Sequence, residues 1–306
     1  MKPRTKAILQ AFFVTFLWSS SWVIIKIALK DLPPLTFAAL RFVIAFLCLL
    51  PFSLKKEYHD QIKGMKWHAW LEIILLGILY YAITPGGQNL GLHYLPANTL
   101  SLILSFTAVA VAFLGMLFLK ERPTLPQWLG MALYLAGVLV YFWHRSGQSI
   151  SVIGIVTGII TMAANSFSAL LGRKINKTGK LSPLLVTTLS MGIGAFLLLG
   201  VGIAIEGFPR LSPIHWLLTC WLAIINTAFA YQLWNKTLVV LPAFDSVLIN
   251  NSMLAQISIL AWVFLDEALT PLQIIGLIIA MMGVAAVQLY SAKKDNLSRW
   301  CSNPPS

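Results

Sequence analysis

One stretch of this chain is written twice. Residues 95–138 and 241–284 align without a gap at an offset of 146 residues, with 14 identities in 44 positions. Both copies open with Leu-Pro-Ala and share Glu, Thr and Gln at 121, 124 and 127, matched by 267, 270 and 273. An internal repeat of this period predicts two copies of one structural unit. The fold must therefore be one that two related halves can build.

Composition places both halves in a membrane. The 306 residues are 58% hydrophobic and 10% charged, with a mean hydropathy of +0.80, which leaves too little polar surface to coat a soluble globule. The net charge of +12 comes from basic residues clustered between apolar runs, so it indicates topology and not nucleic-acid binding. Cys48, Cys220 and Cys301 match no metal or disulfide spacing, and we expect no cofactor.

Ten apolar runs are long enough to cross a bilayer, which takes about 20 helical residues. The basic N-terminus mimics a signal peptide, but its apolar run is too long and lacks a cleavage site, so we keep it as the first span. The predicted spans are 7–29, 34–54, 70–92, 97–119, 126–144, 150–172, 183–205, 213–236, 242–265 and 271–290.

The Lys and Arg residues between spans set the orientation, because they resist translocation. With both termini inside, the outer side keeps Lys30, Arg145 and Arg210. The inner side collects Lys2, Arg4, Lys6, Lys55, Lys56, Lys63, Lys66, Lys120, Arg122, Arg173, Lys174, Lys177, Lys180, Lys236, Lys293, Lys294 and Arg299. Glu121 lies between two basic residues, whereas Glu267 lies between Asp266 and Ala268, so the two copies place this loop on opposite sides.

Five spans in each half make the copies inverted relative to each other. The sequence therefore predicts an all-α membrane protein with ten transmembrane helices, arranged as two inverted five-helix repeats. The repeats are residues 1–146 and 147–292, and a polar tail, 293–306, follows on the cytoplasmic side. We expect a multi-pass protein of the cell (inner) membrane with both termini cytoplasmic.

Several motifs resemble those of one family. The repeat carries Phe-Leu-x-Glu-x-x-Thr-x-x-Gln-x-x-Gly, the first span carries Trp18-Ser19-Ser20-Ser21-Trp22, and Pro34 precedes Arg41-Phe42. Together with Gly91-Leu92-His93-Tyr94 before Ala97, these residues resemble EamA-type members of the drug/metabolite transporter superfamily. The resemblance implies a ten-helix bundle with a central cavity, alternating access, and export or exchange of small metabolites such as amino acids. The segment around Asn165 departs from this pattern, because it lacks the tryptophans and the arginine of the first repeat.

Polar side chains inside spans locate the path, because in lipid they need a partner helix or water. Ser19, Trp22 and Lys26 recur at three- and four-residue spacing on one helical face. Lys26 either meets an anionic group or snorkels to the outer interface. Arg41 lies seven residues past Pro34, about 10 Å deep by helical rise. It either binds substrate anions or holds helix carbonyls.

The third and eighth spans carry matching polar stripes. Tyr80, Thr84 and Gln88 surround a Pro-Gly-Gly break in the hydrogen-bond ladder, and Tyr231 and Trp234 lie in the counterpart span. Such pairs indicate a site between repeats, or interhelical hydrogen bonding. The sixth span adds Asn165, and the ninth adds Asn250 or Asn251, but not both. We expect the substrate to be bound by Trp18, Ser19, Trp22, Lys26, Arg41, Tyr80, Gln88, Asn165, Tyr231, Trp234 and Asn250.

These features favour a secondary transporter of a small metabolite, most simply an amino acid or related zwitterion. A sugar, nucleobase or drug remains an alternative cargo, as does a polytopic enzyme acting on lipid or a noncatalytic partner subunit. Glu121 and Glu267 are interpreted as helix-capping residues and not as catalytic ones. No Asp or Glu lies at mid-membrane depth in the sequence, so a coupling proton stays open, as does the oligomeric state.

Overall fold

The computed structural model describes residues 3–95, 97–119, 124–143, 151–265 and 269–302, and all regular structure in this part of the chain is helical. Within these residues, eight helical segments are long and apolar enough to cross a membrane, judged by length and composition. Two shorter apolar segments, Ile103–Phe118 and Pro271–Val287, lie in the fourth and tenth predicted spans. The chain is therefore a multi-pass membrane protein.

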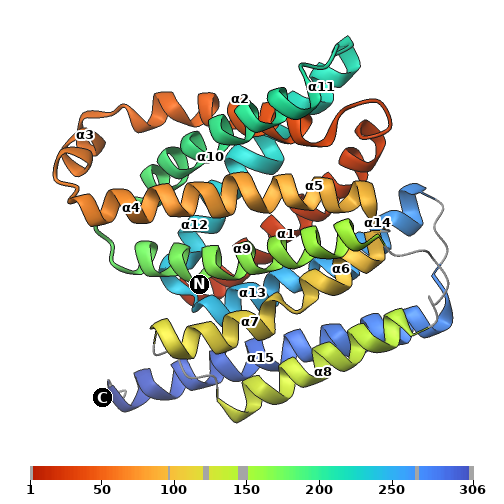
Figure 1. Ribbon diagram of the computed structural model, residues 1–306. Coiled ribbons are helices and arrows are strands. Elements are labelled where there is room, and N and C mark those ends of the chain that lie inside the picture. Colours follow the sequence, from red (N-terminus) through yellow and green to blue (C-terminus); the bar gives the residue numbers. More distant parts are fainter. Residues whose placement is uncertain (1–2, 96, 120–123, 144–150, 266–268, 303–306) are drawn as a thin grey trace.

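The helices follow the predicted spans closely, and π-helical segments continue three of them (Figure 1). In chain order they are α1 (Pro3–Ala28), α2 (Pro34–Ser53), α3 (Lys56–Lys63), α4 (Trp67–Leu76), η1 (Gly77–Ile83), α5 (Thr84–Tyr94), α6 (Ala97–Ser105), α7 (Thr107–Leu114), η2 (Gly115–Leu119), α8 (Leu125–Phe142), α9 (Val152–Lys177), α10 (Pro183–Glu206), α11 (Pro213–Trp221), η3 (Leu222–Phe229), α12 (Ala230–Val240), α13 (Ala243–Asn251), α14 (Met253–Leu265) and α15 (Pro271–Ser302).

Some helical structure lies beyond the predicted spans, most of all in α3 and α15. α3 is a short helix without a buried residue, and it lies in the Lys-rich connection after the second span. α15 continues past the tenth predicted span and into the polar tail. Both extensions are rich in charged residues, so hydropathy could not reveal them.

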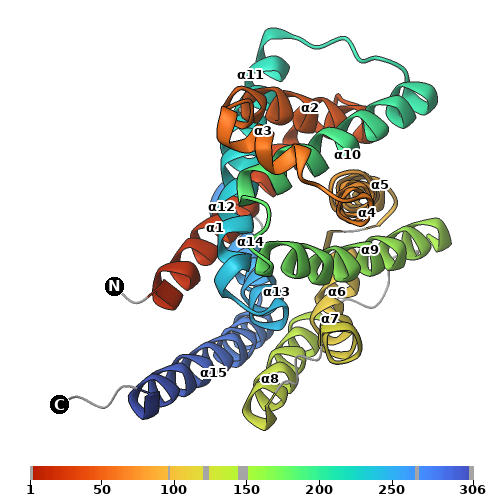
Figure 2. The same cartoon turned by 90° about the vertical axis from the view of Figure 1, so that its left-hand side faces the viewer.

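The contacts between helices are symmetric with respect to the two halves of the chain. α2 packs on α10, and α8 packs on α15 at the opposite side of the bundle (Figures 1 and 2). α1 packs on α12, and its counterpart α9 packs on α5. Likewise α10 contacts η1 while α2 contacts η3. Each of these contacts therefore has a matching contact between the counterparts of the two elements, 146 residues away in the sequence.

Glycines of the repeat allow α8 and α15 to approach closely. A Cβ atom at Gly137 would lie 2.6 Å from the Gly276 carbonyl oxygen, and one at Gly276 would lie 2.7 Å from the Gly137 oxygen. Gly130 and Gly283 meet in the same reciprocal way, at 3.0 and 2.5 Å. Small residues at a helix crossing let backbones touch, which drives association in lipid. The glycines that the two copies share thus form a close contact between α8 and α15.

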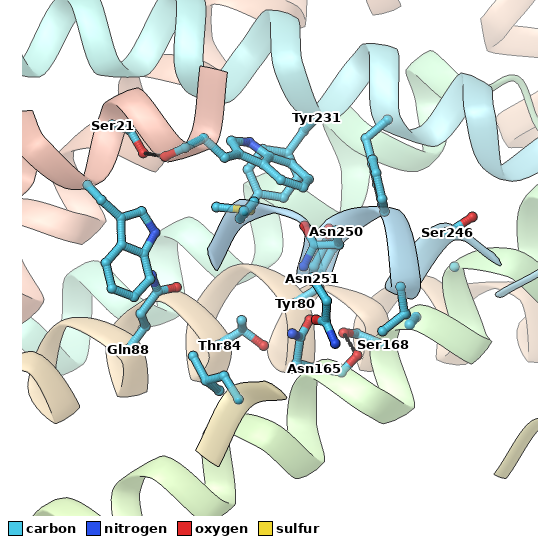
Figure 3. A pocket seen from close by; sticks show the side chains of 18 of the residues that line it. Ser21, Tyr80, Thr84, Gln88, Asn165, Ser168, Tyr231, Ser246, Asn250 and Asn251 are labelled. Carbon is cyan, nitrogen blue, oxygen red and sulfur yellow. Dashed lines mark hydrogen bonds between the residues drawn. The ribbon is translucent and has the colours of Figure 1, made fainter. Parts of the chain in front are cut away.

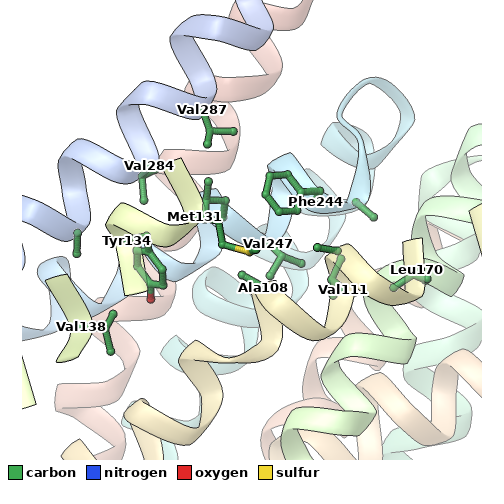
Figure 4. Packing of buried hydrophobic residues seen from close by; sticks show 14 residues of the cluster. Ala108, Val111, Met131, Tyr134, Val138, Leu170, Phe244, Val247, Val284 and Val287 are labelled. Carbon is green, nitrogen blue, oxygen red and sulfur yellow. The ribbon is translucent and has the colours of Figure 1, made fainter. Parts of the chain in front are cut away.

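The same region carries a large buried hydrophobic cluster of described residues (Figure 4). Met131, Tyr134 and Val138 of α8 pack against Val284 and Val287 of α15, with residues of α7, α9 and α13 completing it. This cluster packs α8 and α15, the last helices of the two halves, against α7, α9 and α13.

Thr and Gln of the repeated motif begin α8 and α15. The Gln127 Oε1 atom accepts from the Thr124 backbone N–H at 2.8 Å, and the Gln273 Oε1 atom accepts from that of Thr270 at 2.9 Å. This is a capping box, which satisfies free N–H groups at a helix start. Glu121 and Glu267, which we expected to cap, lie outside the described residues.

Candidate functional site

A cavity of about 160 Å³ lies between the two halves of the described bundle (Figure 3). Its lining includes nine residues expected from the sequence: Trp18, Trp22, Arg41, Tyr80, Gln88, Asn165, Tyr231, Trp234 and Asn250. Their elements are α1, α2, η1, α5, α9, α12 and α13, so both copies of the repeat contribute. Whether these residues bind substrate stays a prediction.

Two π-helical segments frame the cavity at matching positions. η1 covers residues 77–83 and η3 covers 222–229, which is the same stretch displaced by the repeat offset and one residue longer. The Thr84 hydroxyl donates to the Leu79 carbonyl at 2.8 Å, and the Thr227 hydroxyl donates to the Leu222 carbonyl at 2.9 Å, both five residues back. Short π segments are frequent at functional sites, because the wider turn redirects side chains. Here Tyr80 and Asn226, 146 residues apart, both reach the cavity.

The ladder break expected at Pro85 takes this π-helical form. The rod from Trp67 to Tyr94 stays continuous, and the missing N–H of Pro85 falls at the start of α5. A Cβ atom at Gly87 would lie 2.3 Å from the Thr161 hydroxyl of α9, so this glycine serves close approach of α5 and α9. The Pro-Gly-Gly sequence thus adjusts the helix without unwinding it.

Two further helices are interrupted at the cavity. The fourth apolar segment breaks at Phe106 between α6 and α7, and the ninth breaks at Ser252 between α13 and α14, again 146 residues apart. Asn251 Nδ2 donates to the carbonyl of Ser105 at 3.1 Å, so a side chain at one break satisfies a backbone carbonyl at the other. The Tyr134 hydroxyl of α8 lies 3.4 Å from Ser105 Oγ. Broken helices at the centre of a bundle are typical of transporter binding sites.

An aromatic wall forms one side of the cavity. The Trp18 ring lies 5.0 Å from Tyr231 and 5.1 Å from Trp234, measured between ring centroids. Tyr80 lies 5.2 Å from Tyr231. These tilted and edge-on contacts are the favoured geometry for aromatic pairs. The wall joins α1 and η1 of the first half to α12 of the second.

Arg41 is the one charged side chain among the described residues that line the cavity. It is only 9% exposed, and its guanidinium carbon lies 4.8 Å from the Phe42 ring centroid. Its Nε atom is buried without a hydrogen-bond partner in the described structure. The cation–π contact positions the guanidinium but satisfies none of its N–H groups.

Amide side chains from three other elements line the cavity together with Arg41. Asn165 of α9, Gln88 of α5 and Asn250 of α13 line the cavity, and Figure 3 shows Asn165 and the two asparagines of α13 gathered near its centre. Both Asn250 and Asn251 reach the lining, so the expectation that only one would do so was wrong. Adjacent residues of a helix point about 100° apart, but Ser246, Val247, Met253 and Leu254 also line the cavity, so it borders a wide enough arc of this segment for both side chains to reach it. Only Asn251 has its amide engaged at the break.

Ser19 and Lys26 do not line the cavity. Ser19 is fully buried, and its hydroxyl lies 2.7 Å from the Thr15 carbonyl oxygen and 2.9 Å from Gln256 Oε1, which ties α1 to α14. Lys26 is exposed in the last turn of α1. Residues spaced by three or four lie within a broad arc of a helix and not on one line. Trp22 therefore reaches the cavity while its two neighbours on that face do not.

Asn226 is a lining residue that the sequence analysis did not single out. Its side-chain Nδ2 atom donates to the Leu17 carbonyl, and its backbone carbonyl accepts from Trp18 Nε1 at 3.1 Å. It therefore fixes the tryptophan of the aromatic wall. A polar residue in an apolar run, 146 positions after Tyr80, was the available signal. Among the described residues no group of three His, Cys, Asp or Glu side chains is placed to hold a metal.

Comparison with known proteins agrees with this architecture. The model of the EamA-like transporter family matches residues 5–143 and 152–289. The chain is 32% identical to the uncharacterized transporter YvbV of Bacillus subtilis over 70% of this chain and 67% of that one. It is 27% identical to a probable amino-acid metabolite efflux pump of Escherichia coli (90% and 92% covered), and 26% identical to an S-adenosylmethionine/S-adenosylhomocysteine transporter of Chlamydia muridarum (87% and 86%).

A solved crystal structure shares the fold, with a TM-score of 0.75 at 18% identity, covering 93% of this chain and 99% of that one. All three relatives are named as transporters or efflux pumps and none as an enzyme. The chain is therefore a membrane transporter with a small-molecule substrate, and it belongs to the EamA-like transporter family.

Proposed function

We propose that this transporter has ten membrane spans, arranged as two inverted repeats, residues 1–146 and 147–292. Both termini and the tail, 293–306, lie on the cytoplasmic side of the cell membrane. The two segments that the family model matches, the symmetric helix contacts and the inner bias of Lys and Arg support this arrangement. The two shorter apolar segments, 103–118 and 271–287, complete the count of ten.

Transport proceeds by alternating access, in which the two repeats rock around the cavity. One observation carries this mechanism: both the π segments and the helix breaks recur at an offset of 146 residues, and both border the cavity. A site between inverted repeats becomes accessible to either side when one repeat tilts against the other.

The cargo is an amino acid or a related zwitterion. A cavity of about 150 Å³ holds one benzene molecule, so one of about 160 Å³ takes a small metabolite. The aromatic wall suits an apolar side chain, and Arg41 with the amides suits the polar groups of the backbone. The name of the efflux pump from Escherichia coli supports the same class.

Counterflow tests this function. Purified protein is placed in liposomes loaded with a mixture of unlabelled amino acids, and entry of each labelled amino acid is followed. Further arms carry a sugar, a nucleobase and S-adenosylmethionine, and a set with a pH gradient measures proton coupling. We expect exchange of at least one amino acid, with Lys30→Gln, an exposed change outside the cavity, as the matched control. Exchange of only a sugar or a base would refute the amino-acid assignment.

Labelling of single cysteines tests the topology. In a variant without native cysteines, the thiol is placed at Lys30, Lys180 or Arg210. We expect Lys30→Cys and Arg210→Cys to react from outside intact cells, and Lys180→Cys to react only after permeabilisation. Reaction of all three from one side would remove the inverted arrangement.

A further inference from the structure

The charge of Arg41 has no counter-charge in the described cavity. No Asp or Glu is among the lining residues that the structure describes, and the guanidinium makes no hydrogen bond or ion pair to a described residue. A buried charge with no partner is strongly unfavourable, so such groups in membranes usually mark ligand or ion paths. A residue that only held helices together would spend its N–H groups on carbonyls.

The group that fits this position is a single carboxylate. Its two oxygens match the planar fork of a guanidinium, and the pair gains strength away from bulk water. A phosphate monoester would bring about two negative charges to one cation. The rest of the described lining is uncharged, with aromatic side chains among Ser, Thr, Asn and Gln, so no second cation is available to a dianion and a monoanion is favoured.

The remaining polar groups of the cavity are neutral. The side chains of Gln88, Asn165 and Asn250 make no hydrogen bond to another described residue, and Asn250 Oδ1 is buried without a donor. An amide accepts a hydrogen bond from a hydroxyl as well as from an ammonium group. Nothing in the described lining offers an ammonium group the opposite charge that would make its own charge a requirement.

We infer that the cavity selects its cargo by the carboxylate, which Arg41 binds, and that the second polar group is recognised only as a hydrogen-bond donor, whether it is charged or neutral. This inference rests on the proposed function and narrows it. Amino acids and 2-hydroxy acids with the same side chain bind alike. Amino acid amides, which keep the ammonium group but lose the anion, bind poorly.

Matched triplets of competitors test this selection in the counterflow assay and in ligand-induced thermal shift of purified protein. The triplets are the acid, 2-hydroxy acid and amide with the side chains of leucine, methionine and phenylalanine. We expect the hydroxy acid to compete within about three-fold of the amino acid, and the amide at least about ten-fold more weakly, because a buried polar group left unpaired is costly. A phosphate monoester of similar size forms a fourth arm and should compete weakly.

Variants then assign the selection to Arg41. Arg41→Gln should bring the acid and the amide to equal, weak competition, while Arg41→Lys restores part of the difference. Lys30→Gln removes an exposed charge and should leave the ratio unchanged. The inference fails if amides compete like acids, if phosphate competes better, if no acid binds, or if Arg41→Gln keeps the carboxylate preference. If amino acids exchange but amides inhibit that exchange as well as acids do, the proposed function stands and this inference fails.

Discussion

Two buried arginines of this bundle are held in opposite ways. Arg41 and Arg173 are 9% and 7% exposed. Arg173, in α9, donates to the carbonyls of Leu238 at 2.6 Å and Val239 at 3.0 Å, near the end of α12. Arg41, in α2, donates to no described residue and faces the cavity. Burial is the same, but the use of the N–H groups is not.

The difference separates a structural charge from a binding one. The last carbonyls of a helix lack intrahelical donors, and a cation there satisfies them and the helix dipole together. Arg173 therefore fastens α9 to α12. Arg41 keeps its donors for a group that arrives with the cargo, so its burial costs stability and serves transport.

Loss of Arg173 should give the largest effect on stability. Arg173→Gln removes two charge-assisted hydrogen bonds and leaves two carbonyls unsatisfied, at a cost of roughly 3 kcal/mol. Denaturant unfolding in detergent measures this free energy, and we expect the yield of folded protein to drop too. A variant as stable as the parent would show that the α9–α12 contact does not depend on this side chain.

Replacement of Arg41 should leave the fold intact. Arg41→Met removes an unpartnered charge and keeps the volume, so the free energy of unfolding should stay the same or rise by about 1 kcal/mol. Transport should nevertheless fall to background in the counterflow assay. Destabilisation equal to that of Arg173→Gln would place Arg41 with the structural charges.

The sequence predicted where Arg41 lies but not how it is held. Its distance past Pro34 placed it inside a span, and the structure puts it at the cavity. Whether carbonyls or cargo meet its N–H groups depends on helices distant in the chain, so both roles stayed open. Arg173 was counted only as an inner-loop charge, because it lies near the end of its span and the carbonyls it binds are more than 60 residues away.

The sequence predicted the positions of the helices better than the hydrogen bonding within and between them. Hydropathy predicted where most of the apolar helices lie to within a few residues, since apolar length decides their position. The π segments were not predicted, because their hydrogen-bond register depends on tertiary packing. Spacing along one helix also could not reveal that Ser19 contacts Gln256, 237 residues away, and does not line the cavity.

A neutral network next to Arg173 should contribute less than the arginine does. Asn235 Nδ2 donates to Thr187 Oγ1 at 2.9 Å, and Asn235 Oδ1 accepts from Asn176 at 3.0 Å, which joins α9, α10 and α12. Asn235→Ala should cost about 1–2 kcal/mol, because interhelical bonds between neutral groups are modest in membranes. The same unfolding measurement ranks it below Arg173→Gln, and an equal or larger loss would reverse the comparison.

The smallest effect should come from the residue that follows Arg173. The side chain of Lys174 is 57% exposed and forms an ion pair with Glu72 of α4 at 2.7 Å. Exposed pairs contribute about 0–1 kcal/mol, because water and salt screen them. Lys174→Ala should therefore shift the free energy of unfolding by less than about 0.5 kcal/mol, and a double-mutant cycle with Glu72→Ala isolates the pair. A coupling as large as the loss in Arg173→Gln would mean that charge, and not the satisfaction of buried carbonyls, fastens this end of α9.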